Sequence, residues 1–211
     1  ALYEYPASAE VPRERVVALN QAAAGFYAHS FPASWAAGSV PARLGVAPAP
    51  VARNGDAQVS LADFGLGYAP GGWTSLVDHL RSTAQATDRE LVAAGLASYA
   101  KTGRLIDRFR DRLVFPVTAL GVDGQPEVHG FIARRNPDHD PAPGAEADTR
   151  HGPKYLNTPE TDLFRKGHEL FGLTETRTLQ AAGATPVHVE GPVDAVAVTL
   201  AGGGRYFGLA P

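Results

Sequence analysis

The chain has 211 residues, of which 44% are hydrophobic and 19% are charged, so it has enough apolar side chains for one or two folded domains with cores. It contains no cysteine, which excludes disulfide bonds, a zinc ribbon and a cysteine nucleophile within these residues. The formal net charge of −3 conceals a basic stretch between Lys101 and Arg135, so the acidic total does not exclude an anionic partner.

The sequence predicts neither a membrane span nor a signal peptide. No run of eighteen apolar residues occurs, and residues 1–14 lack the basic, apolar and small-residue order of a secretory leader. We therefore expect a cytoplasmic location and no membrane partner.

The first third of the chain predicts one long helix followed by an irregular region. Residues 1–14 form an irregular lead-in, and residues 14–31 place apolar side chains at helical spacing before Pro32 ends the helix. Residues 32–60 are rich in Ala, Pro and Gly, which favours a loop or a poorly ordered insertion. The glycine-punctuated run 64–70 predicts a short strand, and a Pro-Gly-Gly turn follows it.

The middle third predicts two helices and then a hairpin. Trp73 opens a helical stretch, and Thr87 with Asp88 starts a second, capped helix. The runs 112–117 and 127–133 have the period of β-strands and flank an Asp-Gly turn at 123–124, so a hairpin is expected. Residues 136–153 lack core-forming side chains and predict a surface loop.

The last third places two acids around a sharp turn. A helix is predicted from about 174 to 183, and an apolar strand that ends in Glu190 follows it. Gly191 and Pro192 then turn the chain into a second helix, whose first turn carries Asp194. A final strand is predicted at 205–209. Ligands of open α/β sheets collect beyond the carboxyl ends of strands, and paired carboxylates suit a divalent metal. The alternative is that Asp194 only compensates the helix dipole.

Basic and polar side chains form two further candidate groups. Arg108, Arg110 and Arg112 alternate along the chain, so an extended backbone places them on one face, spaced to meet successive phosphates, with Arg134 across the hairpin. The alternative is a solvated strand edge with Asp107 and Asp111 as ion-pair partners. Lys154 and Lys166 flank a segment in which Tyr155 and Asn157 can hydrogen-bond a nucleotide.

Five stretches together resemble the catalytic core of bacterial DnaG-type DNA primases. They are FGLGYAP (64–70), DRFRDRLVFP (107–116), GFIAR (130–134), GPKYLNTPETDLFRKGHELFGL (152–173) and VEGPVDAVAV (189–198). The fourth is highly specific, and the set spans the chain from residue 64 to its last strand.

The resemblance implies an α/β protein in which a mixed α+β primase-core subdomain (15–173) precedes the beginning of a TOPRIM α/β subdomain (174–211). It implies synthesis of short RNA primers on a single-stranded DNA template from ribonucleoside triphosphates, by metal-dependent nucleotidyl transfer during DNA replication. Glu190 would be the catalytic acid and, with Asp194, a ligand of Mg²⁺ or Mn²⁺. The template and nucleotide groove would comprise Arg108, Arg110, Arg112, Arg134, Lys154, Tyr155, Asn157 and Lys166. A replicative helicase would bind through regions outside this chain.

Three departures from the family limit what the chain is expected to do. The family's Asp-x-Asp metal motif lies on a later TOPRIM strand and is not reached before Pro211, so this segment alone is expected to make little or no primer. The zinc ribbon is absent, and residues 32–60 match poorly. The alternative function is a non-catalytic module that binds single-stranded nucleic acid within a larger replication or mobile-element protein.

Overall fold

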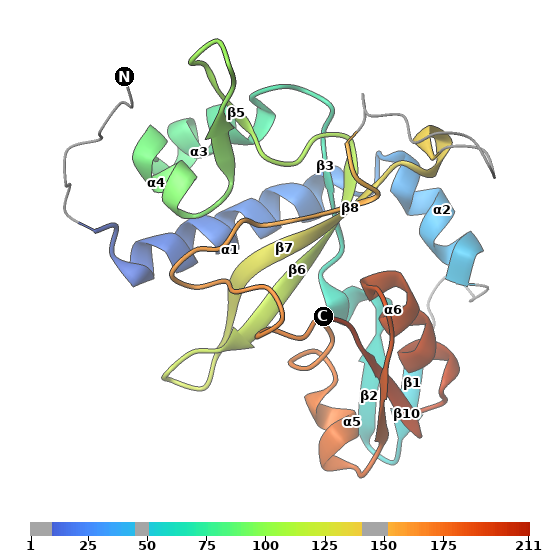
Figure 1. Ribbon diagram of the computed structural model, residues 1–211. Coiled ribbons are helices and arrows are strands. Elements are labelled where there is room, and N and C mark those ends of the chain that lie inside the picture. Colours follow the sequence, from blue (N-terminus) through green and yellow to red (C-terminus); the bar gives the residue numbers. More distant parts are fainter. Residues whose placement is uncertain (1–9, 45–50, 141–151) are drawn as a thin grey trace.

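The fold is organised around a four-stranded antiparallel sheet. The computed structural model describes residues 10–44, 51–140 and 152–211. The sheet has the order β3 (Gly67–Ala69), β6 (Arg112–Leu120), β7 (Pro126–Arg135) and β8 (Tyr155–Asn157), with the long β6–β7 hairpin at its centre (Figure 1). Because successive side chains of a strand point to opposite faces, the sheet supports two separate hydrophobic cores.

Helices cover the first face of the sheet. They are α1 (Arg13–Ser30), α3 (Ser75–Ala84) and α4 (Asp88–Ala93), and α1 lies along the sheet in Figure 1. The buried side chains of α1 recur at helical spacing, and the Tyr27 ring meets Phe131 of β7 edge to face, with 5.5 Å between the ring centroids. Gly67 permits the close approach of α1 to β3, since a Cβ there would lie 2.5 Å from Cβ of Tyr27.

The second face packs on a smaller layer built from the hairpin at residues 51–60 and the C-terminal elements. The hairpin of β1 (Val51–Asn54) and β2 (Ala57–Ser60) meets α5 (Arg177–Ala181) and α6 (Pro192–Ala201). The strands β9 (Thr185–His188) and β10 (Tyr206–Leu209) pair in parallel, with α6 as the crossover between them. This order of strand, helix and strand along the chain matches the order predicted for the C-terminal elements.

Several sequence predictions are confirmed. The long helix, the central hairpin, the capped helix after Thr87 and the strand–turn–helix unit around Glu190 all form. The predicted strand at 64–70 is shorter, because η1 (Leu61–Phe64) occupies its beginning. Helices α3 and α5 are likewise shorter than the stretches predicted for them.

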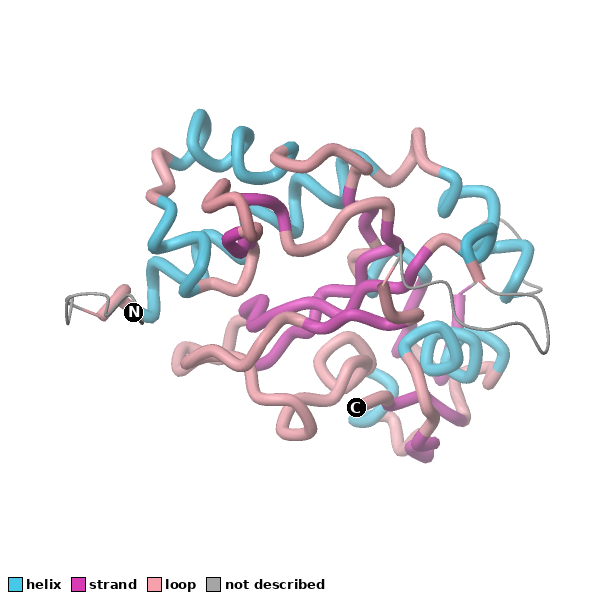
Figure 2. Tube along the Cα trace, turned by 45° about the horizontal axis from the view of Figure 1, so that its top comes forward, coloured by secondary structure: helices cyan, strands magenta, loops and turns pink. Residues whose placement is uncertain are grey.

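The prediction of a loop for residues 32–60 was wrong. The segment contains α2 (Trp35–Leu44) and the β1–β2 hairpin, and Ala36, Val40, Ala52 and Val59 contribute buried side chains to the second core. Figure 2 shows the strands of the central sheet in the middle of the molecule, with helices above them and the C-terminus below them.

The predictions for the loop at 136–153 and for the lead-in at 1–14 fall partly outside the described residues. Within the described part, η2 (Pro137–His139) forms a short turn after β7, and Pro12 precedes α1. Besides β1 and β2, the strands β4 (Ala97–Tyr99), β5 (Leu105–Asp107) and β8 were not predicted; β4 and β5 pair beside α3 and α4. No helix among the described residues is long and apolar enough to cross a membrane.

Candidate nucleic-acid interface

The alternating arginines lie in the connection between β5 and β6 and at the first residue of β6. Phe109, 1% exposed, anchors this connection in the first core, while Arg108 and Arg110 on either side of it remain at the surface. The run is not one straight strand as predicted, since β6 begins only at Arg112 and Asp111 has a φ of +49°. Even so, all three arginines line one pocket.

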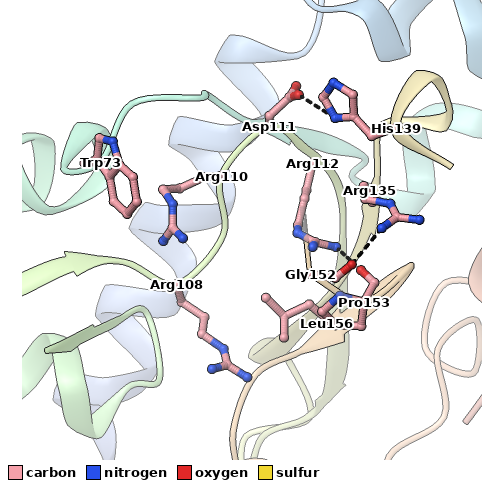
Figure 3. A pocket seen from close by; sticks show the side chains of 10 residues that line it. All are labelled: Trp73, Arg108, Arg110, Asp111, Arg112, Arg135, His139, Gly152, Pro153 and Leu156. Atoms are coloured by element: carbon pink, nitrogen blue, oxygen red, sulfur yellow. Dashed lines mark hydrogen bonds and ion pairs between the residues drawn. The ribbon is translucent and has the colours of Figure 1, made fainter. Parts of the chain in front are cut away.

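This arginine pocket has a volume of about 370 Å³ and lies at one end of the central sheet (Figure 3). The residues that define its character are Arg108, Arg110, Arg112, Arg135, Trp73 and Leu156. They come from the loop before α3, the β5–β6 connection, the start of β6, the end of β7 and β8. Segments that are far apart in sequence therefore supply one basic surface.

A β-bulge decides which arginine of β7 joins the pocket. The pairing that starts at the hairpin turn with Leu120 opposite Pro126 shifts by one residue between Val117 and Thr118. Arg112 consequently pairs with Arg135, whereas the unshifted register would place it opposite Arg134. A one-residue shift exchanges the two faces of a strand, so Arg135 lines the arginine pocket.

Arg134, predicted to lie in the nucleic-acid groove, points to the other side of the hairpin. Its guanidinium lies 3.2 Å from the Asp140 carboxylate, and its side chain is only 4% exposed. It lines a separate cavity of about 160 Å³ beside Trp35 and Val193. Its predicted contact with nucleic acid would therefore require access through this second cavity.

Backbone carbonyl groups hold the pocket guanidinium groups in place. Arg108 donates a 3.1 Å hydrogen bond to the Asn157 carbonyl, and Arg110 donates to the Asp107 carbonyl. Arg112 donates a 2.9 Å hydrogen bond to the carbonyl of Pro153. Arg135 adds a bond to a carbonyl, that of Gly152, but also pairs with Asp140. Carbonyl oxygens orient a guanidinium group without cancelling its charge, so the pocket keeps a fixed positive potential.

Burial and mutual repulsion show in the pKa values of these arginines. Burial lowers the pKa of Arg110, and burial together with the charge of Arg110 lowers the pKa of Arg108. The effect is largest at Arg112, where burial and then the charges of Arg135, Arg110 and Arg108 lower the pKa to about 10. All of these groups are charged at neutral pH, and an anion that enters the pocket relieves the repulsion between them.

Asp111 forms the rim of the pocket and is strongly anchored. Its carboxylate accepts hydrogen bonds of 2.9 Å from Trp35 Nε1 and 2.8 Å from the Tyr68 hydroxyl, and His139 Nδ1 lies 3.7 Å away. Burial and then the bond to Asp111 raise the pKa of Tyr68 to about 12. These contacts account for the left-handed backbone at a non-glycine position, which is a conformation that surrounding structure must enforce.

Strand β8 connects the arginine pocket to the acidic turn before α6. Leu156 lines the pocket, whereas the neighbouring Tyr155 belongs to the second core and packs against Gly191, where a Cβ would lie 3.2 Å from the Tyr155 hydroxyl. The Lys154 ammonium lies 5.9 Å from the centroid of the Tyr155 ring. Tyr155 of β8 thus lies beside the turn that follows Glu190, and the Lys154 ammonium lies near its ring.

Glu190 and Asp194 lie on either side of the turn at the start of α6, and both are exposed. Among the described residues, no group of three or more histidines, aspartates or glutamates is placed to hold a metal ion. Mg²⁺ needs about six oxygen ligands, although water and substrate supply many of them. The two carboxylates therefore form at most part of a metal site.

One further predicted residue lies outside the arginine pocket, and two residues that were not predicted line it. Lys166 is exposed in a turn between the buried Phe164 and Phe171 and does not line the arginine pocket. Trp73 and Arg135 line the pocket but were missed by the sequence analysis. A signal for Trp73 existed, since a tryptophan directly after a Pro-Gly-Gly turn lies outside any apolar periodicity.

Comparison with known proteins places this geometry in a family. Residues 52–177 match the family model described as the DNA primase catalytic core, N-terminal domain. The DNA primase of Mycolicibacterium smegmatis is 41% identical over 190 residues, covering 90% of this chain and 26% of that protein. The DNA primase of Streptomyces coelicolor is 39% identical over 152 residues, covering 72% of this chain and 21% of that protein. The chain thus spans about a quarter of the length of these curated relatives.

Solved structures agree with this assignment. The RNA polymerase domain of Mycobacterium tuberculosis primase DnaG superposes with a TM-score of 0.68 at 34% identity, covering 94% of this chain and 56% of that chain. A DnaG primase catalytic domain bound to ssDNA gives a TM-score of 0.65 at 29% identity, covering 94% and 55%. The resemblance inferred from the motifs and the mixed α+β fold are confirmed. The chain belongs to the family of the DNA primase catalytic core, N-terminal domain.

Proposed function

We propose that this chain is the template-binding part of a DNA primase catalytic core, and that the arginine pocket binds phosphates of single-stranded DNA. One observation carries the proposal. The guanidinium groups of several arginines converge on one pocket, where burial and their mutual repulsion lower the pKa of Arg112 and backbone carbonyls orient Arg108 and Arg112, so an entering anion relieves the repulsion. A strand of DNA supplies phosphates in a row, and arginine matches phosphate geometry.

Two relatives support single-stranded DNA as the partner. One is the DnaG primase catalytic domain bound to ssDNA. The other is the RNA polymerase domain of Mycobacterium tuberculosis primase DnaG in complex with a double-stranded DNA oligomer with a 6-nucleotide overhang. Both are similar to this chain over more than nine-tenths of its length. On this basis we infer that the same polymer binds here.

For the longer protein to which such a core belongs, we propose primer synthesis. A ribonucleotide 3′-OH would attack an incoming ribonucleoside triphosphate, and positioning and charge neutralisation would supply most of the catalysis. Glu190 and Asp194 would contribute part of a Mg²⁺ or Mn²⁺ site, with Glu190 as the catalytic acid. Arg134, Tyr155, Asn157 and Lys166 remain predicted nucleotide or template contacts. Replication would place the protein in the cytoplasm, with a helicase as a further partner.

The binding proposal is tested by the affinity of the 211-residue chain for a fluorescent single-stranded oligonucleotide, measured by anisotropy. Arg110→Ala and Lys154→Ala are expected to weaken binding. Arg177→Ala is the matched control, because Arg177 is exposed at the start of α5, away from the arginine pocket. If Arg110→Ala and Lys154→Ala bind as tightly as Arg177→Ala, the proposed phosphate contacts do not exist.

The catalytic proposal needs the full-length gene product. Glu190→Gln should abolish primer synthesis while DNA binding persists, because the exposed carboxylate contributes no packing. Unchanged synthesis would instead favour a non-catalytic binding module. The 211-residue chain alone is expected to bind DNA weakly and to make little primer with Mg²⁺ or Mn²⁺, and robust synthesis by it would contradict the need for further acidic ligands.

A further inference from the structure

Trp73 is an exposed aromatic side chain at the edge of the arginine pocket. Its exposed fraction is 60%, whereas the other tryptophan of the chain, Trp35, is half-buried and donates its indole N–H to Asp111. Burial of a tryptophan side chain removes a large apolar area from water and so stabilises the fold. The exposed Trp73 ring lacks most of this stabilisation. The position of this ring at the rim of a charged pocket therefore calls for a ligand that has both an aromatic and an anionic part.

The segment that carries Trp73 is fixed to the rest of the structure. The Trp73 carbonyl accepts a 2.8 Å hydrogen bond from the backbone N–H of Asp107. The Asp107 carboxylate in turn accepts hydrogen bonds of 2.9 Å from the N–H groups of Leu76 and Val77 in the first turn of α3. The loop before α3 is therefore held from both sides, which preorganises the ring for binding.

The Arg110 guanidinium lies against the indole ring, with 4.6 Å between its Cζ and the ring centroid. Figure 3 shows the ring and this guanidinium together at one side of the pocket, with Arg112 and Arg135 across from them. A cation–π contact of this kind holds the guanidinium close to the ring while it stays available to an anion. An aromatic surface and phosphate-binding charges thus lie side by side.

We propose that Trp73 stacks on a nucleobase of the single strand whose phosphates occupy the arginine pocket, an inference that rests on the function proposed above. A nucleotide has the combination that the surface calls for, a flat π-face next to a phosphate. Every base has such a face, so the contact adds affinity with little sequence preference. A basic protein segment fits less well, because the neighbouring guanidinium groups repel it. A purely apolar segment also fits less well, because it offers these guanidinium groups no anion.

The test compares Trp73→Ala and Trp73→Phe with the wild-type chain on two strands of equal length, one of thymidines and one abasic. On the thymidine strand, Trp73→Ala should weaken binding by about 5- to 150-fold, the range for one base stacked on an aromatic side chain. Trp73→Phe should retain most of the affinity. On the abasic strand, Trp73→Ala and wild type should bind equally, because no base is present to stack.

Two results would overturn the inference: an undiminished affinity of Trp73→Ala for the thymidine strand, or an equal loss on both strands. The dependence of affinity on salt should stay parallel to that of the wild type, since no phosphate contact is removed. Circular dichroism confirms folding of the variants. If wild type itself does not bind, or if Arg110→Ala has no effect, the proposed function fails as well; if only Trp73→Ala is without effect, the stacking inference alone fails.

A spectroscopic measurement gives an independent readout. In a Trp35→Phe background, Trp73 is the only tryptophan, so its fluorescence reports on its own environment. Saturation with the thymidine strand should quench this fluorescence, and the abasic strand should quench it much less. Equal fluorescence in the free protein and in the saturated thymidine complex would contradict stacking.

Discussion

The carboxylate of Asp107 in β5 accepts a 2.9 Å hydrogen bond from the backbone N–H of Val77 in the first turn of α3. The same carboxylate accepts the N–H of Leu76, and its residue is 1% exposed. Two of the N–H groups that a helix start leaves without a partner are satisfied in this way by a residue thirty positions away. The contact also fixes the beginning of the connection that carries Arg108 and Arg110.

Asp107→Ala should therefore lower the free energy of unfolding by about 2–3 kcal/mol, because it leaves two buried donors without an acceptor. Urea unfolding followed by circular dichroism measures the change. Asp78→Ala, on the exposed side of the same helix, is the control and should have little effect. A loss for Asp107→Ala no larger than that for Asp78→Ala would show that the capping contact is unimportant.

The elements that sequence predicted correctly have strong local signals. The long helix has apolar residues at helical spacing, and the β6–β7 hairpin has an Asp-Gly turn between two β-type runs. The prediction for residues 32–60 was wrong because it rested on their high content of Ala, Pro and Gly and not on the turn signal within them. Its Asn54-Gly55 pair is a hairpin signal, and the strands on either side of it carry Ala52 and Val59 into the core.

The arginine pocket could be predicted in outline but not in detail. The alternation of arginines indicated a basic surface, and that surface exists. Whether Arg134 or Arg135 lines the pocket depends on a bulge between Val117 and Thr118, and no residue pattern in the hairpin predicts this bulge. The participation of Trp73 depends on a long-range backbone contact with Asp107. Register and long-range contacts are set by the whole fold, so the local sequence does not specify them.

Gly208→Ala should destabilise the fold by about 1–3 kcal/mol through overpacking. A Cβ at this position in β10 would lie 2.3 Å from the carbonyl oxygen of Ala195 in α6. Gly25→Ala is the matched control: Gly25 lies within α1 and has open space around it, so alanine there should stabilise by about 0.5–1 kcal/mol. Thermal unfolding of both variants measures the effects, and equal melting temperatures would disprove the close contact.

Glu90 should make the fold sensitive to acid. The hydrogen bond from Arg15 and then the backbone N–H of Thr87 lower the pKa of Glu90 to about 2, from an ordinary value of 4.5. A lowered pKa in the folded state means that this stabilisation is complete above about pH 4.5 and is lost as the pH falls toward 2. Glu90→Gln should therefore reduce the melting temperature at pH 7 more than at pH 3. An equal reduction at both pH values would contradict a role for the carboxylate charge.

The binding of DNA phosphates by the arginine pocket is tested most directly by the salt dependence of affinity for a single strand. The logarithm of the binding constant should fall linearly with the logarithm of the salt concentration, with a slope of about 0.7 per phosphate contact. For the double variant Arg108→Gln/Arg110→Gln, the slope should be shallower than that of wild type by about one to two contacts, whereas the Arg177→Ala control keeps the wild-type slope. A slope of the double variant equal to that of wild type would contradict the account.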